Sequence, residues 1–147
     1  MEKITAKGDH YTAVNIGDPD KVGDYQIIHP ITGHKIEGKI FLRDLTDSTG
    51  TEISFNILPP YTEQPYFHKH IQNEETYIIL TGSGMFQVDE EVFAIEKGSV
   101  VRVSSEGVRS MKNTSGDPML YVVIQSKENS LEQCSQNDSE RIEPVWK

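Results

Sequence analysis

Two histidines and a carboxylate lie close together near the middle of the chain. His68 and His70 are separated by one residue, and Glu74 and Glu75 follow after a short polar stretch. Side chains alternate between the two faces of a strand, so histidines two residues apart point the same way. If the polar stretch turns the chain into a second strand, its first inward carboxylate faces the histidine pair. Two imidazoles and one carboxylate suit Fe(II), Mn, Ni, Cu or Zn rather than Ca.

A His-x-His pair alone is weak evidence for a metal site, because most such histidines lie on a surface or in a core. The carboxylate at hairpin distance strengthens the hypothesis, and so does the turn signal Leu80-x-Gly82-x-Gly84 that follows it. The pattern therefore indicates a metal site, provided that the surrounding elements can build one.

Short strands punctuated by turn residues surround this segment on both sides. Residues 35–42 are expected to form one strand, and residues 52–58 alternate apolar and polar side chains with period two. Residues 77–80 and 85–88 flank a Gly-rich turn and are expected to pair as a hairpin. From residue 35 to residue 125 the pattern predicts eight or nine strands and no helix, which is typical of an antiparallel sandwich or barrel.

The two ends of the chain are polar, and no second domain is visible. We expect one domain over residues 1–147, with an N-terminal arm (1–35), a barrel core (36–127) and a C-terminal segment (128–147). Residues 1–24 are expected to stay outside the core. Trp146 makes the last residues apolar enough to dock on a partner subunit.

Composition narrows the classes of function. The chain has 14 Lys and Arg against 23 Asp and Glu, a net charge of −9, which argues against nucleic acid and anionic membranes as partners. No apolar run is long enough to span a bilayer, and no secretory signal is visible at the N-terminus. Cys134 is the only cysteine, so no internal disulfide is possible, and we expect a reducing cytoplasm.

The spacing of the central motif resembles that of the cupin superfamily. The first cupin motif is G-x5-H-x-H-x(3,4)-E-x6-G, and His68, His70, Glu75 and Gly82 fill it, with Thr62 in place of the leading Gly. The amino-acid sequence around these residues is similar to that of small single-domain bacterial cupins of uncharacterised function. The resemblance implies an all-β fold, the antiparallel double-stranded β-helix or jelly-roll barrel.

The second cupin motif, G-x5-P-x-G-x2-H-x3-N, is only partly present. Gly98 and Asn113 occupy its first and last positions. Between them, Ser104 replaces Pro, Glu106 replaces Gly, and Arg109 stands where the fourth metal ligand, His, is expected. An arginine stays protonated and has no lone pair for a metal.

Three roles for Arg109 follow from this resemblance. In the first, His68, His70 and Glu75 hold a metal with open positions, and Arg109 orients an anionic substrate beside it. In the second, Arg109 pairs with Glu75 and the site is free of metal. In the third, Arg109 lies at the barrel mouth in contact with solvent.

Other pocket residues are expected from the alternation of side chains. Tyr66 shares the face of the two histidines, and Met111 shares that of Arg109. Tyr77 shares the face of Glu75, where it acts as a general acid or packs. Asn56 faces either the cavity or solvent. Arg109, Tyr66, Asn56 and Met111 are therefore candidate ligand-binding residues, and Tyr77 and Arg109 are candidate catalytic residues.

These observations favour a small cytoplasmic cupin that binds a divalent transition metal (Fe, Mn, Ni or Zn), a small anionic or polar molecule, or both. As an enzyme, it is expected to be a metal-dependent isomerase or dioxygenase. The alternative is a non-catalytic, metal-free binding protein in which Arg109 pairs with Glu75. An exposed β-edge, the N-terminal arm and Trp146 favour a homodimer, because unpaired sheet edges are usually covered.

Overall fold

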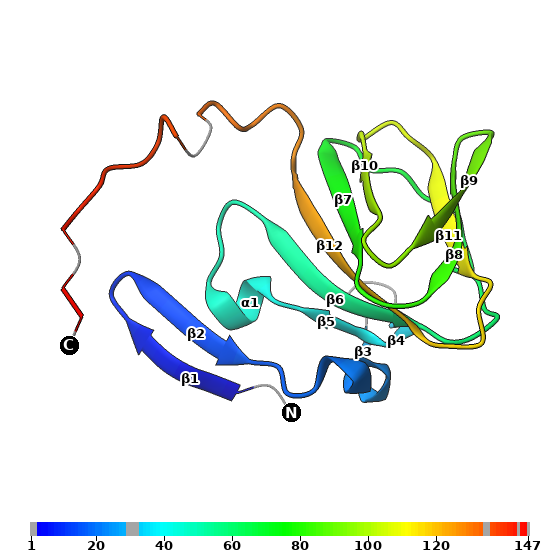
Figure 1. Cartoon of the computed structure of the whole chain (residues 1–147), viewed down its shortest axis with the longest axis horizontal. Coiled ribbons are helices and arrows are strands. Elements are labelled where there is room, and N and C mark those ends of the chain that lie inside the picture. The colour runs from blue at the N-terminus through cyan, green and yellow to red at the C-terminus, as the bar shows by residue number, and fades with distance from the viewer. Residues whose placement is uncertain (1–2, 29–32, 134–135, 144, 147) are drawn as a thin grey trace.

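The computed structural model describes residues 3–28, 33–133, 136–143 and 145–146, and Cys134 lies outside these ranges. Two antiparallel sheets face each other and form a jelly-roll barrel, which confirms the predicted all-β fold (Figure 1). The larger sheet contains, in spatial order, β10 (Val100–Val103), β7 (Asn73–Ile79), β12 (Met119–Lys127), β6 (Glu52–Leu58) and β5 (Lys39–Phe41). The smaller sheet contains β11 (Arg109–Asn113), β8 (Ser83–Val88) and β9 (Glu91–Glu96).

Strict alternation along the strands of the larger sheet separates an inner face from an outer face. On β6 and β7, every second residue is buried and points into the barrel. Apolar side chains from both sheets fill most of the interior: Leu58, Tyr77, Ile79, Phe86, Ile95, Val103, Met111, Met119, Tyr121 and Val123. At one end of the barrel, the inward positions are polar instead, as at Ser54 and Glu75.

The expected hairpin over residues 77–88 is wrong, because β7 and β8 belong to different sheets. β7 pairs with β10 and β12, whereas β8 pairs with β9 and β11. The glycine between them, Gly82, has φ +78° and packs against β12, where an added Cβ would lie 2.9 Å from the Met119 Cα. The Gly-rich turn therefore carries the chain from one sheet to the other rather than folding it back on itself.

The strand expected over residues 35–42 is broken by a glycine. β4 (Lys35–Glu37) pairs with β3 (Gln26–Ile28), and β5 begins after Gly38, whose φ is +68°. A single helical turn, α1 (Arg43–Thr46), follows β5, so the prediction of no helix fails there.

The N-terminal segment contributes to the core, contrary to expectation. β1 (Lys3–Gly8) and β2 (Tyr11–Asn15) form a hairpin beside the barrel, and the 3-10 helix η1 (Pro19–Asp24) follows it (Figure 1). Val22 of η1 has no exposed area and packs with Ile40 and Leu120 on the outer face of the larger sheet. Val22, with Ile16 and Tyr25 packed around the same cluster, thus fixes this segment to the sheet.

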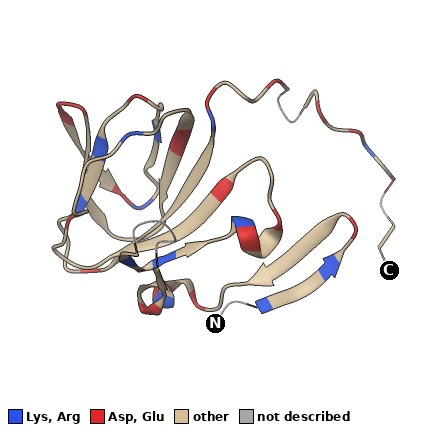
Figure 2. Ribbon diagram, turned by 180° about the vertical axis from the view of Figure 1, so that it is seen from behind, with Lys and Arg blue, Asp and Glu red and all other residues tan. Residues whose placement is uncertain are grey.

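The described residues after Lys127 form no helix or strand, and the segment extends away from the barrel (Figure 1). Trp146 at its end is 97% exposed. Basic and acidic residues are interspersed along the described ribbon rather than separated by sign (Figure 2). None of the described helices is long and apolar enough to cross a membrane.

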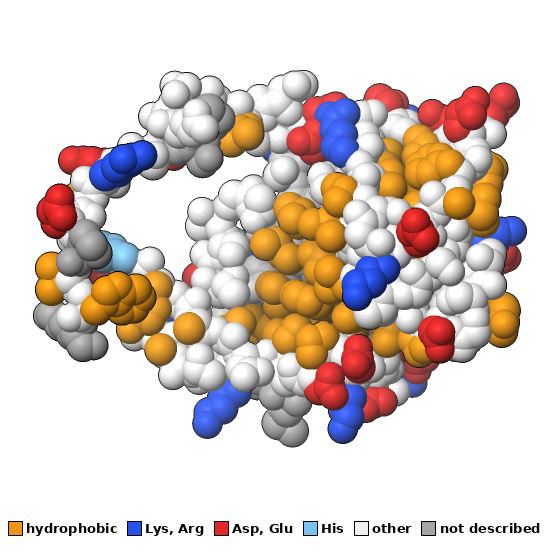
Figure 3. Space-filling model, viewed as in Figure 1, with side chains coloured by type: hydrophobic (Ala, Val, Ile, Leu, Met, Phe, Trp, Pro, Cys, Tyr) orange, Lys and Arg blue, Asp and Glu red, His pale blue; other side chains and the backbone are white. Residues whose placement is uncertain are grey.

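The outer face of the larger sheet carries an apolar patch beyond the part that η1 covers (Figure 3). The strand register places four apolar residues in one row across adjacent strands: Val100, Ile78, Val122 and Phe55. Phe55, at the end of the row, also packs against the cluster that contains Val22. Val100 is 63% exposed, and the other three are partly exposed. We call this row with its surroundings the outer apolar patch.

We expect Val22→Ala to lower the free energy of unfolding by about 2 kcal/mol, because two buried methyl groups are lost and a cavity remains. Val145→Ala removes the same atoms from a side chain that is 80% exposed, and it should change stability by less than about 0.5 kcal/mol. Urea unfolding of both variants measures the difference. Equal stability of the two would mean that η1 does not hold to the sheet.

Candidate metal and ligand site

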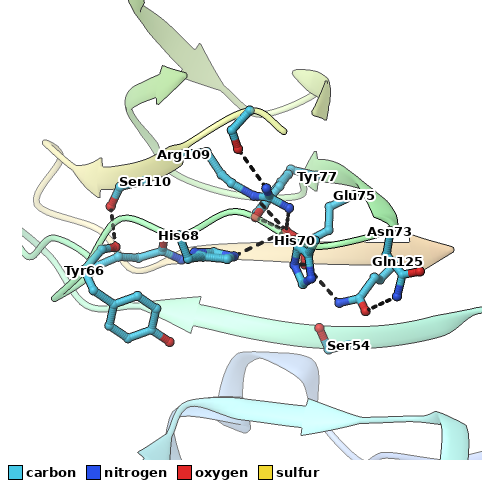
Figure 4. A network of polar contacts seen from close by, with 12 residues as sticks. Ser54, Tyr66, His68, His70, Asn73, Glu75, Tyr77, Arg109, Ser110 and Gln125 are labelled. Carbon is cyan, nitrogen blue, oxygen red and sulfur yellow. Dashed lines mark hydrogen bonds and ion pairs between the residues drawn. The ribbon is translucent and has the colours of Figure 1, made fainter. Parts of the chain in front are cut away.

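The two histidines lie on an extended segment that runs along β11. This segment is not the regular strand that was expected, because its pairing with β11 is limited to bridges at Glu63 and His68. The backbone N–H of His68 donates to the Arg109 carbonyl (3.1 Å) and the Arg109 N–H donates back to His68 (2.9 Å), while the His70 N–H donates to Ser105 (3.0 Å). Both rings nevertheless lie on the same side, with centroids 5.4 Å apart, as alternation predicted (Figure 4).

Glu75 projects inward from β7 and is the centre of a polar network (Figure 4). Its Oε2 accepts hydrogen bonds from the Tyr77 hydroxyl (2.5 Å) and from Nη2 (2.7 Å) and Nε (3.2 Å) of Arg109. Its Oε1 accepts one longer bond from Gln125 Nε2 (3.3 Å), and Asn73 in turn donates to Gln125 Oε1 (2.8 Å). Hydrogen bonds from the protein therefore occupy the acceptor positions of Oε2, whereas Oε1 can still accept another partner.

The histidine nitrogens converge on this carboxylate. His70 Nε2 lies 3.2 Å from Glu75 Oε1, and His68 Nε2 lies 3.6 Å from Oε2. One ligand atom from each of the three residues lies within 4.8 Å of the other two. His70 Nε2 and His68 Nδ1 are buried and make no hydrogen bond in the described structure, and the short contact of His70 lacks the direction of one. A buried nitrogen without a partner is costly unless a cation binds its lone pair. Because His70 Nε2 is such a nitrogen and also faces Glu75, the three residues fit a metal.

The protonation states also suit metal binding. Burial alone would raise the pKa of Glu75, but the His68 ring, the Tyr77 hydroxyl and the Arg109 guanidinium together hold it well below its usual range. Burial lowers the pKa of His70 and outweighs the opposing charge of Glu75. The carboxylate is thus ionised and the His70 imidazole is neutral, and these are the forms that coordinate metals.

Arg109 points inward and has no exposed area. Besides its bonds to Glu75, its Nη1 donates to the Gly107 carbonyl (2.8 Å). The expected solvated position at the barrel mouth is wrong, because no surface of the guanidinium is accessible. Anchoring of a ligand anion by Arg109 stays a prediction. Arg109 is therefore paired with Glu75, and the Glu75 Oε1 atom, whose one hydrogen bond is the long one from Gln125, can still coordinate a metal.

The other expected pocket residues lie at different depths. Tyr66 is 64% exposed at the rim and meets the His68 ring edge-on at 5.8 Å. Asn56 faces inward and is buried, with its amide nitrogen donating to the carbonyl and hydroxyl oxygens of Ser54. Met111 is buried in the apolar core. Of these three, only Tyr66 lies beside the histidines.

A shallow cavity of about 290 Å³ lies along residues 63–67, β8 and β11. Tyr66 and Met111 are among its lining residues, but His68, His70 and Glu75 are not. We therefore assign the site from the converging side chains rather than from this cavity.

Sequence reasoning missed several residues of the inner wall. Gln125 and Asn73 extend the Glu75 network, and Lys39 and Ser54 face inward from β5 and β6. Alternation along β12 predicts that Gln125 shares the inner face of Tyr121 and Val123, so a signal for it was present. For Lys39, alternation could not be used, because the strand is broken at Gly38 and the sequence does not show which residues after the break face inward.

Known proteins share the fold of this chain. The profile of the cupin domain family matches residues 55–125. The crystal structure of a cupin protein from Bacteroides fragilis is 32% identical to this chain, covers 81% of it and 98% of its own length, and superposes with a TM-score of 0.69. A predicted oxalate decarboxylase from Thermotoga maritima is 20% identical over 70% of this chain and 90% of its own, with a TM-score of 0.56, which shows the fold alone.

A curated relative, an uncharacterized protein of Methanocaldococcus jannaschii, is 30% identical over 60 residues. The matched region is 41% of this chain and 48% of that protein, so the match spans about half of that relative's length.

We expect Arg109→Met to lower the free energy of unfolding by about 4 kcal/mol, because it leaves the buried Glu75 carboxylate without its cation. Arg102→Met is the matched control. Arg102 pairs with Glu74 and Glu128 on the surface with its side chain half exposed, and its loss should cost less than about 1 kcal/mol. Denaturant unfolding of both variants measures the two costs, and equal costs would contradict the buried pair.

Proposed function

The chain belongs to the cupin family, and we propose that it binds a divalent transition metal inside the barrel through His68, His70 and Glu75. The observation that carries the proposal is the buried, unpaired Nε2 of His70, 3.2 Å from a carboxylate oxygen that the rest of the network leaves largely free. Iron, manganese, nickel and zinc all suit this donor set. When bound, such a metal supplies Lewis acidity toward a carbonyl group or one-electron chemistry with dioxygen.

Arg109 and Tyr77 are positioning residues in this proposal. Both donate to Oε2 of Glu75, so they fix the carboxylate and keep it ionised while Oε1 faces His70. Burial and the charge of Glu75 raise the pKa of Tyr77 above its usual range, so its proton stays on the phenol and is committed to Glu75. The bond from Tyr77 therefore supports a role in orienting the Glu75 side chain as a metal ligand rather than a role in general acid catalysis.

The ligand class follows from charge. Three protein ligands leave open coordination positions, and the Arg109–Glu75 pair is neutral as a unit. A divalent cation therefore brings a net positive charge into the cavity, which favours a small anionic or polar molecule. With such a ligand the metal chemistry would be isomerisation or dioxygenation.

A metal-free binding protein is the second candidate function. The observation that favours it is that Arg109 already satisfies the charge of Glu75 without a metal. The two candidates differ in one measurable property, the affinity of the purified protein for metal.

We expect the chelator-treated protein to bind one Mn²⁺ ion per chain in titration calorimetry. His70→Gln should weaken this binding by at least about 100-fold, because a neutral amide replaces an imidazole ligand. His10→Gln alters an exposed histidine in the β1–β2 turn and should leave the affinity unchanged. Elemental analysis of the untreated protein identifies the natural metal. Equal Mn²⁺ affinity in the parent and the His70 variant would reject the site.

We also propose that the protein is a homodimer. β5 and β10 are unpaired edges of the larger sheet, and the outer apolar patch lies between them. Burial of such a patch against a second copy removes apolar surface from water. The exposed Trp146 adds a further apolar group.

Light scattering across a concentration series should give the mass of a dimer. Val100→Asp places a charge on the outer apolar patch and should shift the protein to monomer. Val92→Asp, on the smaller sheet, changes a valine that is 54% exposed and should leave the mass unchanged. A monomer mass for the parent at all concentrations would reject the dimer.

A further inference from the structure

Lys39 is a cationic residue on the inner wall that the metal motif does not include. It lies on β5, where its neighbour Ile40 faces outward and is buried against Val22 and Leu120. Alternation therefore turns Lys39 and Phe41 to the inside of the barrel. Lys39 pairs with Asn56 on β6, which in turn pairs with Tyr121 on β12, so the three residues form one row across the inner face.

The Lys39 side chain leans toward the metal site and has no ionic partner. Its Nζ lies 4.5 Å from the centroid of the Phe41 ring, one row closer to Glu75. In the described part of the chain, no carboxylate lies within ion-pair distance of this ammonium. Burial lowers the pKa of Lys39, and the charges of Glu75 and Glu52 act against that shift.

Ser54 provides a second donor on the same wall. It lies on β6 opposite Phe41 and faces the histidine cluster (Figure 4). The Asn56 amide donates to the Ser54 Oγ at 3.0 Å, which leaves the Ser54 hydroxyl proton free to donate, since no acceptor for it is found among the described residues. The amide also donates to the Ser54 carbonyl at 3.1 Å, so Asn56 fixes the position of Ser54.

We propose that Lys39 and Ser54 bind a carboxylate group of the ligand on the wall opposite His68 and His70. One ammonium matches the single charge of a carboxylate, whereas a phosphate dianion would call for further cations. The proposal rests on the proposed function in one respect: a second oxygen-donor group of the same small acid reaches the metal. Arg109, which is enclosed with Glu75, is not needed for this contact.

Succinate, a small dicarboxylate, tests the proposal by calorimetry with the Mn²⁺-loaded protein. Lys39→Met should weaken succinate binding at least tenfold, Lys39→Arg should retain most of it, and Ser54→Ala should weaken it less than Lys39→Met. Lys97→Met removes an exposed lysine in the turn before β10 and should have no effect. Mn²⁺ binding, measured separately, should not be weakened in any of the four variants, which also shows that each is folded.

The outcomes separate this proposal from the metal site. Equal succinate affinity in the parent and Lys39→Met overturns the role of Lys39, and so does a parent that does not bind succinate. Lys39-dependent binding of inorganic phosphate without binding of succinate overturns the carboxylate assignment. If the parent does not bind Mn²⁺, the proposed function fails, and the same comparison in the metal-free protein still decides whether Lys39 binds a carboxylate.

Discussion

The buried ion pair between Glu75 and Arg109 is the constraint on which the rest of the site depends. A carboxylate inside a barrel is strongly disfavoured unless a cation and hydrogen bonds compensate it. Arg109 supplies both through its side chain. Its backbone also exchanges two hydrogen bonds with His68, so one residue fixes the carboxylate and one of the histidines together. Loss of either interaction therefore displaces the other.

The two oxygens of Glu75 explain how an arginine and a metal fit the same pocket. Oε2 is held by Arg109 and Tyr77, and Oε1 remains directed toward His70. The arginine and a divalent ion about 5 Å apart repel by about 7 kcal/mol at an effective dielectric constant of 20. Glu75, between them, and an anionic ligand both offset this repulsion. With Arg109 at the position of the fourth motif histidine, the proposed site keeps three candidate metal ligands and favours an anionic ligand.

The local site was largely predictable from the sequence, and the long-range arrangement was not. Spacing by two was enough to place His68 and His70 on one side, and Glu75 falls on the inward positions of β7. The turn at Gly82 has the same local chemistry in a hairpin and in a crossover, so it did not reveal that β7 and β8 separate. Val22 carries no periodic signal, because the apolar residues of this segment that pack on the sheet, Ile16, Val22 and Tyr25, are unevenly spaced.

The residue that we assign to ligand binding is placed by an edge strand rather than by the metal motif. Gly38 has a positive φ and accepts a hydrogen bond from Ile57, and an added Cβ there would lie 3.0 Å from the Ile57 carbonyl oxygen. This contact fixes β5 in the register that sets Lys39 opposite Asn56. A slip of one residue would turn Lys39 outward and Ile40 into the cavity. Changes in β5 can therefore alter the charge of the ligand wall while His68, His70 and Glu75 stay in place.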